Sequence, residues 1–201
     1  KVHYIIADKS REQVRAYDRN GKLVTAYPAT IGSAATPSPT GTHSVERVAL
    51  NPNYTYNPKI NFQQGENNKI LTIPPGPNGP VGSVWIALSK PTYGIHGTPN
   101  PETIGKTNSH GCIRLQKPFE FAYALLARQS DTPKQYFHQV LNSGKETKVT
   151  LETKVPVHMI YRTAFVSEDG RAEFRRDIYG RDAKIWKALE NAGVTLNAVQ
   201  G

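Results

Sequence analysis

Glycine and proline interrupt this chain so often that long helices have little room to form. The sequence contains 16 Gly and 15 Pro among its 201 residues. Glycine is too flexible for a helix interior and proline lacks the amide proton that a helix needs, so a helical bundle is excluded. Hydrophobic residues make up 37% and charged residues 20%, a balance that is not typical of a disordered chain. We therefore expect a turn-rich, mostly β protein.

Runs of β-branched and aromatic residues predict strands over the first half of the chain. These strands are expected at residues 2–6, 13–17, 23–27, 84–88 and 93–97. The stretch at 36–41 (TPSPTG) is predicted to be rigid, because its two prolines hold the backbone extended. Residues 51–82 are rich in Asn, Pro, Gly and Tyr without a sustained period. We expect them to form a long ordered surface excursion, of a kind that often borders a binding site.

The hydrophobic period changes from that of a strand to that of a helix after residue 115. An amphipathic pattern with Pro118 in its first turn predicts a helix over 117–128. Later elements are expected as a short helix at 133–141, strands at 146–151 and 155–166, and a helix at 182–192 ended by Gly193. With no internal repeat or evident boundary, we expect a single domain over 1–201. Its core would be 1–128, and 129–201 would pack on or extend it.

The net charge is +9, from 25 Lys and Arg against 16 Asp and Glu. Such a surface attracts anionic partners of any kind. No more than two basic residues are adjacent (Arg175 and Arg176), which argues against nucleic-acid binding. No apolar run approaches the ~20 residues of a membrane helix, and the first residues lack the features of a signal peptide. We expect no nucleic-acid partner and no membrane span.

A single cysteine, Cys112, lies in the segment Ser-His-Gly-Cys-Ile-Arg at 109–114. One cysteine excludes an internal disulfide, and a lone thiol is either a small buried hydrophobe or a nucleophile. Attack requires a thiolate, which a nearby imidazole, positive charge or helix N-terminus favours. His96, with 15 residues between it and Cys112, and Arg114 are candidates for the first two. Gly111 permits a tight turn whose amides at 110–112 converge on a developing oxyanion.

Two other interpretations of this cysteine are less consistent with its surroundings. A zinc site would combine His43, His96, His110 and Cys112, but structural zinc sites usually repeat closely spaced ligand pairs and catalytic sites usually take three protein ligands. An inert core cysteine fits poorly beside the polar and glycine residues at 105–111. Neither a metal ion nor a cofactor is expected.

These residues resemble the signature of the YkuD-type L,D-transpeptidases. In that family a histidine followed by Gly or Ser precedes Ser/Thr-His-Gly-Cys, an apolar residue and Arg or Asn; here it reads His96-Gly97 and then 109–114. The resemblance covers residues 1 to about 128, and 155–158 and 177–182 resemble the C-terminal portion of larger periplasmic members. It implies a mainly β, α+β fold: a β-sandwich-like catalytic domain with flanking helices.

The resemblance implies a cysteine acyltransferase that acts on bacterial peptidoglycan. Cys112 would attack the diamino acid in the third position of a tetrapeptide stem and release the terminal D-alanine. The acyl group would then pass to the side-chain amine of another stem, forming a 3→3 crosslink. His96 would serve as general base, and the carbonyl of Gly97 would orient its ring.

The same resemblance implies roles for the residues around the nucleophile. The oxyanion hole would be formed by His110, Gly111 and Cys112. Ser109 would support the turn or the histidine and is a candidate for substrate binding. Tyr93 would line the donor groove or belong to the core, and Arg114 would either anchor a stem carboxylate or form a structural ion pair.

The acceptor and the covering of the site stay open. Water, a free D-amino acid or an envelope-protein amine would each use the same acyl-enzyme, for carboxypeptidase, exchange or anchoring reactions, and a non-catalytic wall-binding module is a further alternative. The short spacing between His96 and Cys112 leaves no room for the capping segment of the larger members, so any lid would come from residues 51–82. Carbapenems are expected covalent inhibitors, peptidoglycan stems the expected partner, and the periplasm or cell envelope the expected location, with a role in cell shape.

Overall fold

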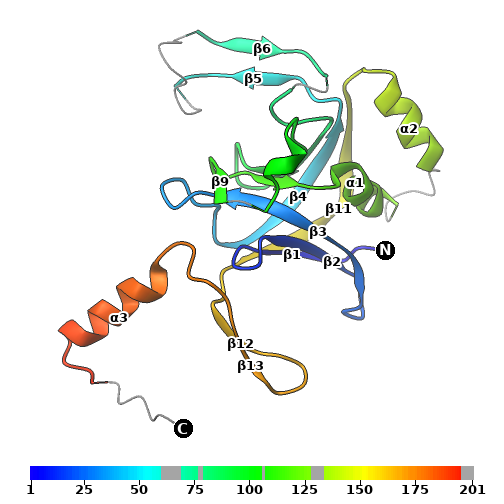
Figure 1. Cartoon of the computed structure of the whole chain (residues 1–201). Coiled ribbons are helices and arrows are strands. Elements are labelled where there is room, and N and C mark those ends of the chain that lie inside the picture. The colour runs from blue at the N-terminus through cyan, green and yellow to red at the C-terminus, as the bar shows by residue number, and fades with distance from the viewer. Residues whose placement is uncertain (60–68, 77–78, 106, 128–133, 196–201) are drawn as a thin grey trace.

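Nine strands form one sheet that curls back on itself in this computed structural model (Figure 1). The structure describes residues 1–59, 69–76, 79–105, 107–127 and 134–195. The strands of this sheet are β1 (Tyr4–Asp8), β2 (Gln13–Tyr17), β3 (Leu23–Gly32), β4 (Gly41–Leu50), β7 (Val84–Leu88), β8 (Gly94–His96), β9 (Thr107–Ser109), β10 (Ile113–Leu115) and β11 (Thr147–Ile160). Their order is β10-β8-β7-β4-β11-β1-β2-β3-β9, and β10 also pairs with β3. That extra pairing closes the curled sheet next to Cys112.

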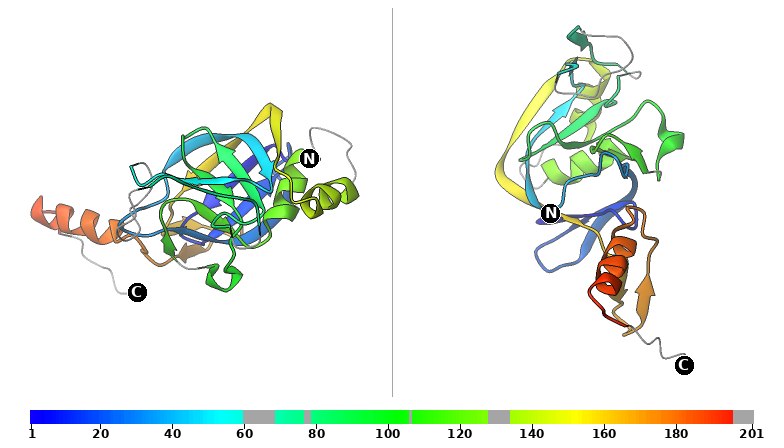
Figure 2. Two further views of the ribbon diagram at one scale, coloured as in Figure 1. Left: turned by 90° about the horizontal axis from the view of Figure 1, so that it is seen from above. Right: turned by 90° about the vertical axis from the view of Figure 1, so that its left-hand side faces the viewer.

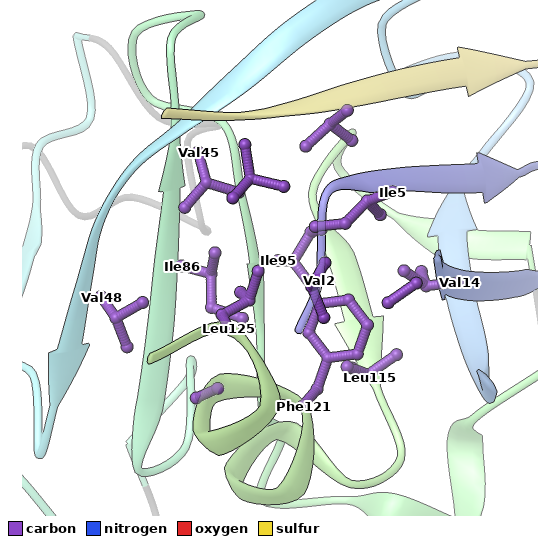
Figure 3. Close-up of a cluster of buried hydrophobic side chains, with 14 of the residues drawn as sticks. Val2, Ile5, Val14, Val45, Val48, Ile86, Ile95, Leu115, Phe121 and Leu125 are labelled. Atoms are coloured by element: carbon purple, nitrogen blue, oxygen red, sulfur yellow. The ribbon is translucent and has the colours of Figure 1, made fainter. Parts of the chain in front are cut away.

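The core lies inside the curl and against one helix, α1 (Pro118–Leu126). Alternation along the strands sends Ile86 and Ile95 inward, where both are fully buried. The helix adds Phe121 and Leu125 to the same cluster (Figure 3). Each such side chain contributes about 1.5–3 kcal/mol through burial of apolar surface. Because α1 follows β10 after a short connection, this packing holds the strand that begins beside Cys112.

The predicted helices and the mainly β architecture are confirmed. Residues 117–128 were expected to be helical and form α1, with Pro118 in its first turn. The other two predicted helices are α2 (Lys134–Asn142) and α3 (Arg181–Asn191), and a short 3-10 helix spans Pro101–Thr103. Within the described residues, no helix is long and apolar enough to cross a membrane.

One prediction about the C-terminal strands is wrong in its extent. The expected strand at 146–151 and the first part of that at 155–166 form a single strand, β11, which ends at Ile160 and has a register shift between Thr150 and Val155. β11 runs parallel to β1 and antiparallel to β4, so it is held on both sides. The chain leaves the sheet after Ile160 and forms a hairpin of β12 (Ala164–Val166) and β13 (Ala172–Phe174).

The surface excursion expected at 51–82 contains a second hairpin. Its strands are β5 (Tyr54–Tyr56) and β6 (Leu71–Ile73), which pair antiparallel above the curled sheet (Figure 1). Residues 60–68 and 77–78 of the excursion lie outside the described residues.

The β12–β13 hairpin and α3 extend away from the sheet at the C-terminal end of β11 (Figure 2). No residue of α3 is buried, so local interactions specify this helix. The Asp177 carboxylate accepts hydrogen bonds from the amides of Arg181, Asp182 and Ala183, which satisfies the free N–H groups of the first turn. At the other end, Gly193 adopts a φ of 80° and Val194 donates to the Leu189 carbonyl at 3.0 Å, a Schellman termination.

Candidate active site

Cys112 lies one residue before β10, beside the strand that ends at His96. β8 and β10 are parallel neighbours, with Ile95 opposite Ile113 and His96 opposite Arg114. Both isoleucines face the core, with exposed fractions of 0% and 1%. Because side chains alternate along a strand, His96, Arg114 and Cys112 share the opposite face. The topology therefore brings together the histidine, arginine and cysteine that the motif predicted.

The His96 ring is fixed by a hydrogen bond and by an aromatic neighbour. Its Nδ1 lies 2.5 Å from the carbonyl oxygen of Gly97. Because a carbonyl oxygen only accepts, Nδ1 carries the proton and Nε2 keeps a lone pair. One ring face is covered by Trp85, whose centroid lies 5.4 Å away. Burial lowers the pKa of His96 to about 4, against the Gly97 hydrogen bond, and the charge of Arg114 adds to the lowering. His96 is thus a neutral base near neutral pH.

The thiol of Cys112 is protonated in the resting structure. Burial raises its pKa, although a backbone hydrogen bond with Gly94 and the charge of Arg114 lower it. The S–H group donates to the carbonyl of Thr92, with 3.6 Å between Sγ and the oxygen. Arg114, one of the groups expected to favour a thiolate, does lower this pKa, but desolvation of the thiolate is the largest cause and acts in the opposite direction. A neutral thiol and a neutral imidazole on one sheet face require proton transfer during attack.

A loop of residues 109–112, here called the nucleophile loop, is held together by Ser109. Its hydroxyl donates to the carbonyl of Cys112 and accepts from the amide of Gly111, with 3.3 Å between nitrogen and oxygen. Gly111 has a φ of 106°, and a Cβ there would lie 2.8 Å from a ring carbon of Tyr93. Only glycine fits this turn without strain.

The substrate-binding candidates occupy different environments around the loop. Ser109 is 2% exposed, with its hydroxyl engaged inside the loop. Tyr93 packs against Gly111 and carries the ammonium of Lys90 at 4.8 Å from its ring centroid, while the side chain of His110 is exposed. Arg114 is half-buried, and no carboxylate of the described residues lies within ion-pairing distance of it. A cation without such a partner suits a carboxylate ligand.

Two aromatic residues of this region were missed by sequence reasoning. Tyr54, in β5, is half-buried, and its pKa is raised by burial first and then by the proximity of Cys112. The β5–β6 hairpin thus brings a phenol toward the thiol, from within the segment expected to supply any lid. Trp85 alternates with the buried Val84 and Ile86 in β7, so strand periodicity could have placed it on the His96 face.

A cavity of about 410 Å³ lies beside this region, lined by Asn51, Pro75, Gly76, Gly82, Ser83, Thr98, Leu141 and Gly144. Cys112 and His96 are not among its lining residues, so the cavity is separate from the thiol. Within the described residues, no three His, Cys, Asp or Glu side chains gather as a metal site would require. His43, from the zinc interpretation, instead contacts the Thr40 carbonyl through Nε2 at 2.9 Å.

Comparisons with known proteins agree with the motif. The model of the YkuD family, described as an L,D-transpeptidase catalytic domain, matches residues 2–157. The YkuD protein of Bacillus licheniformis is 37% identical over 102 residues, which cover 51% of this chain and 46% of that protein. That of Bacillus subtilis (strain 168) is 33% identical over 114 residues, covering 57% and 54%. The chain thus spans about half the length of these curated relatives, both of which carry L,D-transpeptidase in their names.

Solved structures give more distant likenesses. An L,D-transpeptidase from Mycobacterium smegmatis has 18% identity and a TM-score of 0.48, covering 78% of this chain and 58% of that one. An LD transpeptidase in complex with imipenem has 18% identity and a TM-score of 0.47, with the same coverage.

Proposed function

Because this chain belongs to the YkuD family of L,D-transpeptidase catalytic domains, we propose that it is a cysteine L,D-transpeptidase acting on bacterial peptidoglycan. One observation carries the proposal: His96, with Nδ1 bound to the Gly97 carbonyl, shares a sheet face with Cys112 and Arg114. That arrangement supports a neutral general base next to a protonated nucleophile.

In the first half of the reaction, Nε2 of His96 takes the thiol proton as Sγ of Cys112 attacks the carbonyl carbon of the diamino acid in a tetrapeptide stem. The tetrahedral intermediate collapses when the imidazolium returns this proton to the nitrogen of D-alanine. The C–N bond breaks, D-alanine leaves, and a thioester remains on Cys112. The depressed pKa of His96 favours this return, because a desolvated imidazolium near the charge of Arg114 is a stronger acid.

In the second half, the side-chain amine of another stem's diamino acid attacks the thioester. His96 accepts a proton from this amine and then gives it to the departing sulfur. The product is a 3→3 crosslink and the free enzyme. Water, a D-amino acid or an envelope-protein amine would enter at this step, giving a tripeptide, an exchanged stem or an anchored protein.

We assign the backbone amides of His110, Gly111 and Cys112 as the donors that bind the oxyanion. In the resting structure the Gly111 amide donates to the hydroxyl of Ser109 at 3.3 Å, beyond the usual range for such a bond. An oxyanion is a stronger acceptor than a hydroxyl, so it would draw this donor away. Preorganised donors of this kind each lower a barrier by about 2.7–4 kcal/mol.

We assign substrate recognition to Arg114 and to two tyrosines near the thiol. Arg114 would bind a stem carboxylate, supported by its lack of an ion-pair partner among the described residues. Tyr93, directly before β8, and Tyr54, in β5, would both border the donor stem. The net charge of +9 would concentrate the protein on the anionic wall, in the periplasm or cell envelope.

The test is incubation with a disaccharide-tetrapeptide, followed by mass spectrometry of the products. We expect dimers that have lost one D-alanine, and their absence with Cys112→Ala and His96→Gln. His138→Gln is the matched control, because that histidine is exposed on α2. A tripeptide without dimers would identify water as the acceptor. No product and no mass adduct with a carbapenem, from a folded protein, would exclude the proposed activity and favour a wall-binding module.

A further inference from the structure

The nucleophile loop is supported from outside by the connector, defined here as residues 33–40 between β3 and β4. The carbonyl of Ser109 accepts two hydrogen bonds from it. One comes from the amide of Ser33 at 3.0 Å and the other from the hydroxyl of Thr36 at 3.2 Å. The same serine holds Gly111 and Cys112 through its own hydroxyl. Ser109 is therefore the junction between the connector and the nucleophile.

The connector is in turn held from its other side, both at its own residues and at Gly32, the last residue of β3, which leads into it. The hydroxyl of Tyr179 donates to the carbonyl of Gly32 at 2.8 Å. The buried ammonium of Lys9 donates to the carbonyls of Ser38 and Pro39, each at 3.2 Å. These partners come from opposite ends of the chain, and both act on the same short turn.

The turn between these contacts is too tight to absorb a displacement. Gly32 donates its amide to the hydroxyl of Ser38 at 2.9 Å. A Cβ on Gly32 would lie only 2.3 Å from the Thr36 carbonyl oxygen and 2.4 Å from the Ser38 nitrogen. Close packing transmits movement because no free volume is available to take it up. A shift at Gly32 therefore reaches Thr36 and, through its hydroxyl, Ser109.

Tyr179 is well placed to hold this turn because its own position is fixed. It is 8% exposed, and its ring stacks on Tyr161 with 5.3 Å between centroids. The guanidinium of Arg181 lies 5.0 Å from the Tyr179 ring and 4.9 Å from the Tyr161 ring. Asp177 accepts a hydrogen bond from the Tyr161 hydroxyl at 2.5 Å and caps α3. All four residues lie beyond residue 157, where the family match ends.

We propose that Tyr179 is a positioning residue for Cys112: through the connector and Ser109, the C-terminal segment at 161–181 holds the nucleophile loop in its reactive arrangement. The proposal rests on the proposed role of Cys112 as the nucleophile. Loss of the Tyr179 hydroxyl frees the connector, and the nucleophile loop then opens more often. The thiol becomes more accessible to small reagents, while its alignment with His96 and substrate is lost.

The experiment uses the full chain and follows Cys112, the single cysteine, by its alkylation with iodoacetamide and intact mass over a pH series. Tyr179→Phe removes the buried hydrogen bond to Gly32, together with the contacts of this hydroxyl with Ser38, and keeps the ring. We expect alkylation about fivefold faster, the change in opening equilibrium for one such bond. The pH midpoint of alkylation should fall, because opening relieves the burial that raises the thiol pKa. Crosslinking of tetrapeptide stems should show a lower kcat, because the closed loop has lost a support that aligns Cys112 with His96.

Tyr136→Phe is the matched control, because this tyrosine is 51% exposed on α2. In this variant, Cys112 should be alkylated at the wild-type rate. Thr36→Val removes the hydrogen bond from the Thr36 hydroxyl to the Ser109 carbonyl. It should reproduce the faster alkylation of Tyr179→Phe. The double variant should show no further change, since both substitutions release the same loop.

The proposal is overturned if Tyr179→Phe lowers Tm while its alkylation rate and midpoint match Tyr136→Phe, or if the effects of Tyr179→Phe and Thr36→Val simply add. If Tyr179→Phe fails to fold, Thr36→Val alone tests the proposal. An alkylation rate of Cys112 in Thr36→Val equal to that of the wild type would then refute it. Wild-type protein that is alkylated but makes no acyl-transfer product would instead refute the proposed function, and the alkylation comparison would still hold.

Discussion

The indole of Trp85 stacks on the imidazole of His96, with ring centroids 5.4 Å apart and ring planes inclined by 23°. The two residues are direct partners in the antiparallel pairing of β7 with β8. Gly94, two residues before His96, makes room for the indole. The stacked ring keeps water from one face of the base and so favours its neutral form.

Replacing Trp85 should make His96 easier to protonate. In Trp85→Leu the smaller side chain admits water to the imidazole, so the pKa of His96 should rise from about 4 toward its ordinary 6.5. NMR titration of the imidazole C–H signals measures this, and the acid limb of the pH–rate profile should move with it. Trp186→Leu, on the exposed helix α3, should leave both unchanged. An unmoved His96 titration in Trp85→Leu would show that the stacking has no effect on the base.

A methyl group at Gly94 should destabilise the fold. A Cβ there would lie 2.6 Å from Cζ2 of Trp85 and 2.8 Å from the carbonyl oxygen of Ile86. We expect Gly94→Ala to lower the free energy of unfolding by about 1–3 kcal/mol, the usual cost of overpacking, as measured by urea denaturation. Gly76→Ala, where a Cβ meets nothing within 4 Å, should change it by less than about 0.5 kcal/mol. Equal stabilities of the two variants would contradict the close contact.

Stability should fall as the pH is lowered from 6.5 toward 4. The pKa of His96 is about 4 in the fold and 6.5 as its ordinary value, so between these values the unfolded chain binds the proton and the native protein does not. Stability therefore rises with pH across this window. Between pH 7.5 and pH 5 the wild type should lose about 2 kcal/mol through this group. In His96→Gln, urea denaturation should show that this part of the pH dependence is gone, whatever the variant's absolute stability; an unchanged slope would place the titration elsewhere.

Arg114 should contribute to substrate binding more than to the reactivity of the thiol toward neutral reagents. Loss of a charge-assisted bond to a stem carboxylate should reduce kcat/KM for the tetrapeptide about 10-fold to 100-fold in Arg114→Gln. Lys117→Gln, a cation at the helix start outside the shared face, is the control. If Arg114→Gln left kcat/KM intact, the carboxylate assignment would be wrong.

Local structure was largely predictable from the sequence because it depends on neighbouring residues. The helix that became α1 follows from its hydrophobic spacing and Pro118, and the strand of His96 from its aromatic and β-branched residues. The extent of β11 was not predictable, because its continuity depends on pairing with β1 and β4, which lie far away in the sequence. Tyr54 was missed for the same reason: only the β5–β6 hairpin brings it toward Cys112.

The sequence by itself determined the chemical groups of the candidate site, since a histidine, a cysteine and an arginine at that spacing form a specific signature of one family. The tertiary structure decided the state of those groups. Burial by distant segments keeps His96 neutral and Cys112 protonated. The physical reason is that a pKa depends on the solvent and charges around a group, and these are set by the closure of the sheet, the ring of Trp85 and the packing of elements far apart in the chain.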